Sequence, residues 1–335
     1  MNPLVSILIP SYNSEKWIKS TIESALSQTW KNKEVIIVDD GSTDNTYNII
    51  KQYESKILKV ITQSNSGACV ARNNAFSNAQ GDFIQWIDAD DILAPDKIEL
   101  QLANIDQSPQ TRILHSSAFG LFYFRVKKAK FRRNPLWQDL SPKNWIMTQM
   151  VKGYWMFPPV WLVSRKLSEL AGSWDERLKL NQDGEYFCRV VASSEFVKFH
   201  PKAHSYYRKG NVSSISSTRA GKSLESLALS KSLCVDHLLN LENSEITRKA
   251  CINYLQSNIS LPDDVESPAI EANRNRIIEL GGSIVPPTKT KKFNIIKKII
   301  GMKTALLLKR KLWNIEIVVR KSWDKLLAHI YGDGI

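Results

Sequence analysis

The stretch that decides the fold lies at residues 34–42 and reads EVIIVDDGS. Its four consecutive apolar residues are typical of a buried β-strand. The Asp-Asp-Gly-Ser sequence that follows them is typical of a loop. Two carboxylates, Asp39 and Asp40, are therefore expected directly after a strand.

The same arrangement recurs on both sides of this stretch. Further apolar strands are predicted at residues 5–9, 60–62 and 83–87. Helical spacing of apolar residues predicts helices at 14–28, with Ser14 as N-cap, and at 46–54 and 68–79. This alternation predicts an α/β fold with a doubly wound, mainly parallel, Rossmann-like sheet. Ligands of such sheets bind beyond the carboxyl ends of the strands, so the polar clusters at 11–13, 39–40 and 88–91 should converge.

The rest of the chain predicts a division into three parts. A strand is expected at 119–126, a helix at 184–193 opened by Asp183, and a strand at 203–209. From residue 221 the pattern is helical, and Pro286-Pro287 indicates a linker. We therefore predict a catalytic domain over 1–220, a helical extension over 221–285 and a basic amphipathic helical tail over 286–335.

Charge is concentrated in that tail. The chain has 335 residues and a net charge of +13, and residues 285–335 carry twelve Lys or Arg against three Asp or Glu. A basic amphipathic tail predicts peripheral binding to an anionic membrane surface, with packing on the catalytic domain as the alternative. No motif of nucleic-acid binding accompanies the charge. The N-terminus lacks a signal-peptide pattern and no apolar run reaches about 18 residues, which predicts a cytoplasmic protein. If the tail binds membrane, the protein is expected to be peripheral at the inner membrane face.

Two aspartates one residue apart follow the strand at 83–87. Asp88 and Asp90 offer oxygen ligands of the kind that Mn²⁺ or Mg²⁺ prefers. Such a cation neutralises the negative charge that develops on a departing diphosphate. The sequence therefore predicts a divalent-metal site at the end of this strand.

Several motifs, taken together and in order, carry a family resemblance. They are VSILIPSYN at 5–13, QTW at 28–30, EVIIVDDGSTD at 34–44, NSG at 65–67, ARN at 71–73 and IDADD at 87–91. A second block combines GSWDE at 172–176 with QDGEY at 182–186. This set resembles family 2 glycosyltransferases. The resemblance implies a GT-A fold, inversion at the anomeric carbon, a divalent metal and a nucleotide-diphosphate sugar donor, with UDP as the expected nucleotide. It also implies a glycan or lipid-linked acceptor in the synthesis of cell-surface polysaccharides or glycoconjugates.

The resemblance also assigns roles to the donor-side residues. Pro10, Tyr12 and Asp39 would line the base pocket, with the Tyr12 ring available for stacking. Arg72 would approach the nucleotide or diphosphate, which suits its guanidinium fork. Asp88 would lie near the ribose and the metal. Asp90 would be the main metal ligand, with Asp91 as a second one.

Inversion in a single displacement requires a base that takes the proton of the acceptor hydroxyl. Asp183 is the predicted base, with a helix N-cap as its alternative role and with Asp175 and Glu185 as the next candidates. The preceding residue is Gln182 where the family often has Glu. Arg208 stands near a position where many relatives have His, and it is predicted to contact the donor diphosphate.

Two further features remain open between a functional and a structural role. The Trp-rich stretch 137–161 would either stack acceptor sugars or pack the core. The basic stretch 127–133 would either contact an anionic acceptor or lie in solvent. A non-catalytic nucleotide-sugar-binding scaffold is the competing function, whereas a dinucleotide-dependent oxidoreductase is disfavoured because the first strand-to-helix turn has no Gly-rich fingerprint.

Overall fold

The computed structural model describes residues 2–103, 111–209, 222–259, 267–284, 322 and 324–326, and the structural statements below concern these residues. Its first sheet has the strand order β3-β2-β1-β4-β8. The strands are β1 (Val5–Ser11), β2 (Lys33–Asp39), β3 (Leu58–Thr62), β4 (Phe83–Trp86) and β8 (Val163–Ser164). The first four are parallel, and only β8 pairs in the antiparallel sense. The predicted α/β class with a mainly parallel sheet is confirmed.

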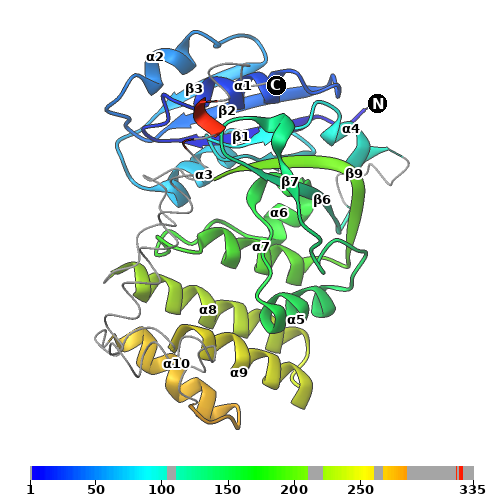
Figure 1. The fold of residues 1–335 in the computed structure, drawn as a ribbon, viewed down its shortest axis with the longest axis vertical. Coiled ribbons are helices and arrows are strands. Elements are labelled where there is room, and N and C mark those ends of the chain that lie inside the picture. Colours follow the sequence, from blue (N-terminus) through cyan, green and yellow to red (C-terminus); the bar gives the residue numbers. More distant parts are fainter. Residues whose placement is uncertain are drawn as a thin grey trace.

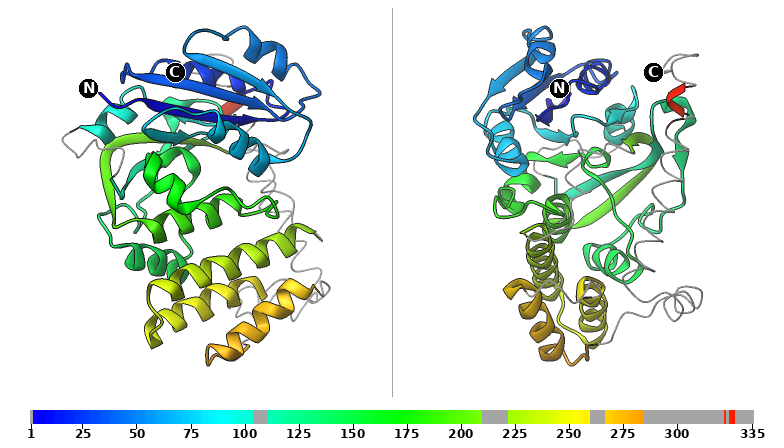
Figure 2. Two further views of the ribbon diagram at one scale, coloured as in Figure 1. Left: turned by 180° about the vertical axis from the view of Figure 1, so that it is seen from behind. Right: turned by 60° about the vertical axis from the view of Figure 1, so that its left-hand side comes forward.

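Alternate residues of the central strands feed two hydrophobic cores. Ile7 and Ile9 of β1 point to one face, where they meet α1 (Ile18–Leu26) and α2 (Thr46–Lys51). Leu8 points to the other face, towards α3 (Ala68–Ser77) and the larger core. Because both faces of the central strands are covered, these strands are rich in apolar residues, as parallel strands usually are. Figures 1 and 2 show this sheet at one end of the molecule.

The first helix begins later than its apolar spacing predicts. We predicted Ser14 as N-cap, but α1 begins at Ile18, and the Ser14 hydroxyl donates to the carbonyl of Tyr12. The carbonyl of Ser14 accepts from the N–H groups of Trp17 and Ile18. Ser14 therefore holds the turn that leads from β1 into the helix.

A second sheet lies beside the first and has the order β5-β9-β6-β7. Its strands are β5 (Ile92–Leu93), β6 (Ile113–Phe122), β7 (Lys130–Phe131) and β9 (Phe196–Arg208). Long β6 and β9 are parallel neighbours (Figure 2). The strand predicted at 119–126 is wrong in its bounds, because β6 starts six residues earlier, at Ile113, and includes a polar segment, His115-Ser116-Ser117, that is nevertheless fully buried.

Helices surround and extend this frame. They are α4 (Lys97–Leu102), α5 (Pro142–Lys152), α6 (Arg165–Ala171) and α7 (Gln182–Ser193), with the short 3₁₀ turns η1 (Val126–Lys128) and η2 (Pro158–Val160). The chain then forms α8 (Lys222–Leu241), α9 (Glu245–Ile259) and α10 (Pro268–Glu279), which pack on one another and through α8 on α7 (Figure 1). A helical C-terminal portion is thus present, as predicted. None of the helices among the described residues is long and apolar enough to cross a membrane.

Most of the basic tail predicted at 286–335 lies outside the described residues. Its described part contacts the α/β part of the chain: the carboxylate of Asp324 accepts from the N–H of Phe124 at 3.0 Å and from Nε of Arg125 at 2.9 Å. The side chains of both members of this ion pair are about 15% exposed. This contact places one point of the tail on the segment that follows β6.

Candidate active site

The carboxyl ends of β2, β1 and β4 form one edge of the first sheet, and the predicted residues gather there. Register pairs Ser11 with Asp39 and Leu8 with Trp86. Because neighbouring strands lie about 4.8 Å apart, Asp39 and the turn after β4 are separated by roughly 10 Å across β1. Strand β1 therefore lies between the predicted base pocket, at the end of β2, and the predicted metal site, after β4.

The residues predicted for the base pocket lie together at this edge. Asp39 is 3% exposed and both of its oxygens accept from Ser42, at 2.5 Å from the hydroxyl and 3.2 Å from the N–H. Tyr12 follows β1 and its side chain is 48% exposed, while Pro10 is partly buried. An exposed ring beside a fixed carboxylate offers the two contacts, stacking and hydrogen bonding, that a nucleobase uses.

Asp40 has a purely structural set of partners. Its oxygens accept from the side chain of Gln63 and from the N–H groups of Ser66 and Gly67, each at 2.8 Å. These bonds hold the loop that leads into α3. Because Gly67 has φ of 99°, a conformation that favours glycine, the loop can turn sharply and begin the helix that carries Arg72.

Arg72 lies between an acid and an aromatic ring. Its Nη2 donates to Asp88 at 2.8 Å, and its guanidinium lies over the Trp174 ring at 4.3 Å. The side chain is about 5% exposed, and Nε and Nη1 have no hydrogen-bond partner among the described residues. A buried guanidinium with donors in reserve can bind a phosphate oxygen without losing its existing bonds.

The three aspartates after β4 differ in orientation. Asp88 and Asp90 are partly exposed, whereas Asp91 is fully buried. Oδ1 of Asp91 accepts from the N–H of Arg208 at 2.9 Å. Burial, followed by the charges of Asp90 and Asp88, raises the pKa of Asp91 well above its usual value. Asp91 therefore joins the turn to β9, and we leave it out of the proposed metal ligands.

Arg208 is held by protein groups on every side. Its Nε donates to the carbonyl of Asp90, Nη1 to that of Tyr123 and Nη2 to the hydroxyl of Ser20. Its guanidinium also lies 4.3 Å from the Trp17 ring and 4.5 Å from the Phe122 ring. We therefore assign Arg208 to the frame beneath the acidic turn and leave it out of the proposed diphosphate contacts.

Asp183 lies within reach of the same charges. It is the second residue of α7, and the N-cap is Asn181, with φ of 58°. The pKa of Asp183 is raised by burial and by the charge of Asp88, while Arg72 opposes the rise. The structure thus brings Asp183, Asp88 and Arg72 together, and the N-cap alternative is wrong.

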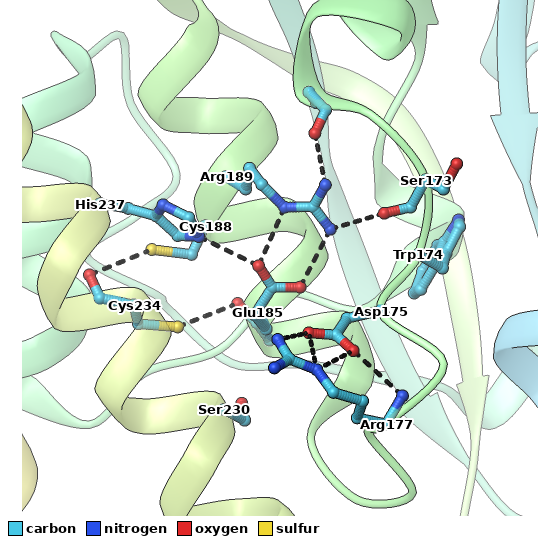
Figure 3. A network of polar contacts seen from close by, with 12 residues as sticks. Ser173, Trp174, Asp175, Arg177, Glu185, Cys188, Arg189, Ser230, Cys234 and His237 are labelled. Carbon is cyan, nitrogen blue, oxygen red and sulfur yellow. Dashed lines mark hydrogen bonds and ion pairs between the residues drawn. The ribbon is translucent and has the colours of Figure 1, made fainter.

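The other two acids considered for the base are fully engaged elsewhere (Figure 3). Asp175 accepts from the N–H and the guanidinium of Arg177 within its own turn. Glu185 is 2% exposed and accepts from Arg189 at 2.9 Å and from His237 of α8 at 3.0 Å. Both contribute to the packing of α7 and its preceding loop, so neither is available to an acceptor hydroxyl.

The fit of a divalent cation rests on two carboxylates. No group of three or more His, Cys, Asp or Glu side chains in the described part of the chain could hold a metal by itself. Asp88 and Asp90 remain at the exposed side of the turn. Mg²⁺ is commonly held by one or two carboxylates together with substrate phosphates, so this pair fits a cation that arrives with a diphosphate.

The contacts of two residues around the site, Trp174 and Gln182, are not predicted by the sequence. Trp174 stacks on Tyr186 with ring centroids 3.9 Å apart and supports Arg72 from below. Oε1 of Gln182 accepts from the thiol of Cys69 at 3.0 Å, which ties the start of α7 to α3. Both roles depend on contacts between residues more than 100 positions apart in the sequence, and the only signal was the presence of Trp174 within the motif 172–176.

Comparisons with known proteins find a family model and several relatives that match part of the chain. Residues 6–154 match the family model described as Glycosyl transferase family 2. The putative teichuronic acid biosynthesis glycosyltransferase TuaG of Bacillus subtilis (strain 168) is 48% identical over 103 residues, which are 30% of this chain and 41% of the relative. The Escherichia coli UDP-Glc:alpha-D-GlcNAc-diphosphoundecaprenol beta-1,3-glucosyltransferase WfgD is 42% identical over 101 residues, 30% of this chain and 40% of the relative. The chain therefore matches less than half the length of these two proteins.

A solved structure shares the fold over a longer span. The structure of S. aureus TarS 1-349 in complex with UDP-GlcNAc superposes with a TM-score of 0.66 at 21% identity, and the match covers 82% of this chain and 81% of that one. At this level of identity the likeness concerns the fold alone.

Proposed function

We propose that this chain is a member of glycosyl transferase family 2, whose model matches residues 6–154, and that it is an inverting enzyme that transfers a sugar from a nucleotide diphosphate to a hydroxyl group. The observation that carries the proposal is the meeting of Asp183, Asp88 and Arg72 at the carboxyl edge of the parallel sheet. An acid with a raised pKa beside an arginine and a second carboxylate suits general base catalysis next to a bound diphosphate.

The proposed donor is a UDP-sugar. Tyr12 stacks on the base, Asp39 accepts from a ring N–H, and Pro10 completes the pocket wall. Arg72 uses its reserve donors on the diphosphate. The name of the WfgD relative specifies a UDP-Glc donor, and TarS, which has a similar fold, was solved with UDP-GlcNAc. These two names support the choice of nucleotide and leave the sugar open.

Asp88 and Asp90 would hold Mn²⁺ or Mg²⁺. When bound, such a cation neutralises negative charge on the diphosphate oxygens. Asp88 also keeps Arg72 in place through their 2.8 Å bond, so one carboxylate serves both the cation and the arginine. Asp91 and Arg208 fix the backbone of the turn from beneath.

The chemical step then follows from the position of Asp183. The acceptor oxygen attacks the anomeric carbon as the bond from that carbon to the diphosphate oxygen breaks, and its proton passes to the Asp183 carboxylate. Attack from the face opposite the leaving group inverts the configuration. The proposed acceptor is a hydroxyl of a glycan or lipid-linked glycan in cell-surface polysaccharide synthesis, as the names of the relatives suggest.

The test compares Asp183→Asn with Asp175→Asn, which alters an acid already paired with Arg177. Release of UDP from a panel of UDP-sugars, with and without Mn²⁺, is measured together with UDP affinity. We expect Asp183→Asn to lower turnover by about 10²- to 10⁴-fold with UDP affinity unchanged, because a general base contributes about that much. Asp175→Asn should retain turnover.

Two outcomes would count against this proposal in different ways. Wild-type turnover in Asp183→Asn would reject the base assignment. Nucleotide binding with no turnover by the wild-type protein, with any of the donors and with acceptor glycans supplied, would favour the non-catalytic scaffold.

A further inference from the structure

An exposed aromatic ring lies beside the candidate active site. The Trp155 side chain is 43% exposed. Three other rings hold it in place: Phe119, Phe157 and Tyr207, at centroid distances of 5.3, 6.1 and 5.2 Å. An indole that is fixed from beneath and open to solvent presents a large apolar surface at little cost in conformational entropy. This is the surface on which the apolar face of a sugar ring can pack.

Tyr207 connects this ring to the carboxylates. Burial raises the pKa of the Tyr207 phenol, and the charges of Asp91, Asp90, Asp183 and Asp88 raise it further. These charges act on the phenol because they lie close to it. The next residue of β9, Arg208, donates to the side chain of Asp91 and to the carbonyl of Asp90, so Trp155 lies one aromatic ring away from the strand end that contacts the acidic turn.

Cationic side chains continue the same surface. Leu121 of β6 pairs with Tyr207 on one side and with Lys130 of β7 on the other. Paired residues of neighbouring strands point to the same face of a sheet, so Lys130 shares the face of Tyr207 and Trp155. Two strand spacings place the backbone of Lys130 roughly 10 Å from that of Tyr207.

The segment 127–133 adds further positive charge next to Trp155. Its five basic residues are all exposed and form no ion pair with the described residues: Lys127, Lys128, Lys130, Arg132 and Arg133. The segment is tied to Trp155, because the side chain of the next residue, Asn134, donates to the carbonyl of Trp155 at 3.2 Å. Exposed cations held near one another attract an anionic partner.

We propose that Trp155 and the basic segment 127–133 form the acceptor subsite, and that the acceptor is an anionic glycan. This inference rests on the proposed function and specifies its substrate class. One sugar ring packs on the Trp155 indole. The adjoining sugar, which carries the reacting hydroxyl, is directed past Tyr207 towards Asp183. Carboxylate or phosphate groups further along the glycan contact Lys130, Arg132 and Arg133.

The test measures binding of three probes to the full chain: a hexagalacturonate, a phosphomannan fragment and neutral mannohexaose. Trp155→Ala should weaken binding of all three probes by roughly tenfold, the upper range for an aromatic contact. The triple variant K130Q/R132Q/R133Q should weaken binding of the two anionic probes only, and added salt should reduce the wild-type affinity for them. The two anionic probes distinguish a carboxylate-bearing acceptor from a phosphate-bearing one.

Matched controls come from exposed side chains elsewhere. Tyr47→Ala removes an exposed ring on α2, and K56Q/R248Q/K249Q removes three exposed cations remote from β7. Both controls should bind the probes as the wild type does. If Trp155→Ala binds the probes as the wild type does, Trp155 has no role in acceptor binding. If K130Q/R132Q/R133Q binds the anionic probes as tightly as its control does, the proposed anionic acceptor is rejected.

The same samples separate this inference from the proposed function. UDP-sugar affinity and donor hydrolysis are measured in every variant and should stay at the wild-type value, because none of the altered residues contacts the proposed donor site. If the variants bind both the donor and the glycan probes as the wild type does, only the proposed acceptor subsite is overturned. Failure of the wild-type protein to bind any nucleotide sugar overturns the proposed function itself.

Discussion

Three neighbouring aspartates, Asp88, Asp90 and Asp91, have different partners, and these partners limit what each carboxylate can do. Asp91 accepts from the backbone of β9, and Asp88 accepts from Arg72. Asp90 contributes its carbonyl to Arg208 and keeps its side chain on the partly exposed side of the turn. One short motif thus supplies a structural acid and the two acids that are proposed to bind a cation.

The charge of Arg72 should set the pH at which the base becomes active. Arg72 lowers the pKa of Asp183, while burial and Asp88 raise it. Removing the positive charge in Arg72→Gln should therefore raise this pKa further. Because Asp183 must be ionised to accept a proton, the acid limb of kcat/KM should move to higher pH.

Arg72→Lys is the matched control for this prediction. Lysine keeps the charge but loses the fork that suits a diphosphate. We expect both variants to bind UDP more weakly, whereas only Arg72→Gln should displace the acid limb of kcat/KM measured between pH 5 and 9. An acid limb at the same pH in the two variants would show that Arg72 does not tune the base.

At the residue scale, the sequence identifies the acids by their position after predicted strands. The sequence does not reveal which carboxylate oxygens already accept hydrogen bonds from other groups of the protein. Arg208 illustrates this, because its place near the site was foreseen but the four rings and carbonyls around its guanidinium come from distant segments. A partner that is far away in sequence leaves no local pattern.

The start of α7 positions Asp183, the proposed base, through an unusual turn. Asn181 adopts a left-handed conformation with φ of 58°, and its side chain donates to the hydroxyl of Ser230 in α8 at 2.6 Å. Gln182 next to it accepts from Cys69 of α3. The element that carries Asp183 is thereby fixed to helices on two sides.

Gly184 should be intolerant of any side chain. A Cβ placed there would lie 2.4 Å from Oδ1 of Asn181. The Asn181 side chain is held in place because its Nδ2 donates to the hydroxyl of Ser230. Helix propensity alone favours Ala over Gly by about 1 kcal/mol. We expect Gly184→Ala instead to lower the free energy of unfolding by about 1–3 kcal/mol, as overpacking does, when measured by urea denaturation.

The double variant Asn181→Gly with Gly184→Ala provides the check. It removes the side chain that the new methyl group meets, so it should be more stable than the sum of the two single changes predicts. A stabilising Gly184→Ala, or strict additivity, would contradict the proposed clash.

Elements with regular apolar patterns were predictable, and others were not. The parallel strands β1 to β4 and the helices between them lie near their predicted places, because β1, β2 and β4 are buried on both faces and their apolar runs are easily recognised. The early half of β6 was missed because His115, Ser116 and Ser117 are polar yet 0% exposed. Their burial is imposed by β9, which joins the sheet from some 80 residues away.

At the scale of the whole molecule, the two sheets are joined around a cluster of buried basic groups. His115 of β6 lies with Nδ1 3.0 Å from Nε2 of His200 on β9. Fully buried Lys97 of α4 acts on both rings, as does Lys198, and Asp139 partly offsets these charges at His200. Burial, then the neighbouring positive charges, lowers the pKa of His115 to about 3 and that of His200 to about 4.

This cluster should make the fold sensitive to mild acid. The unfolded chain protonates its histidines below about pH 6.5, whereas the folded protein keeps His115 neutral down to about pH 3. More protons are then bound by the unfolded state, so stability is lost as the pH falls from 6.5 towards 3. For one fully buried histidine the loss approaches about 1.4 kcal/mol per pH unit, and His200, which is only partly buried, should add less.

Urea denaturation of the wild type and of His115→Gln at pH 7.5, 6.0 and 5.0 tests this expectation. Glutamine keeps a polar partner for His200 but does not titrate, so the variant should lose about 2 kcal/mol less than the wild type between pH 7.5 and 5.0. Most carboxylates titrate below that window, which leaves the histidines as the main groups that change charge. Equal losses in the two proteins would mean that the His115 ring is already accessible to protons, and hence that β6 and β9 do not form the closed interface described above.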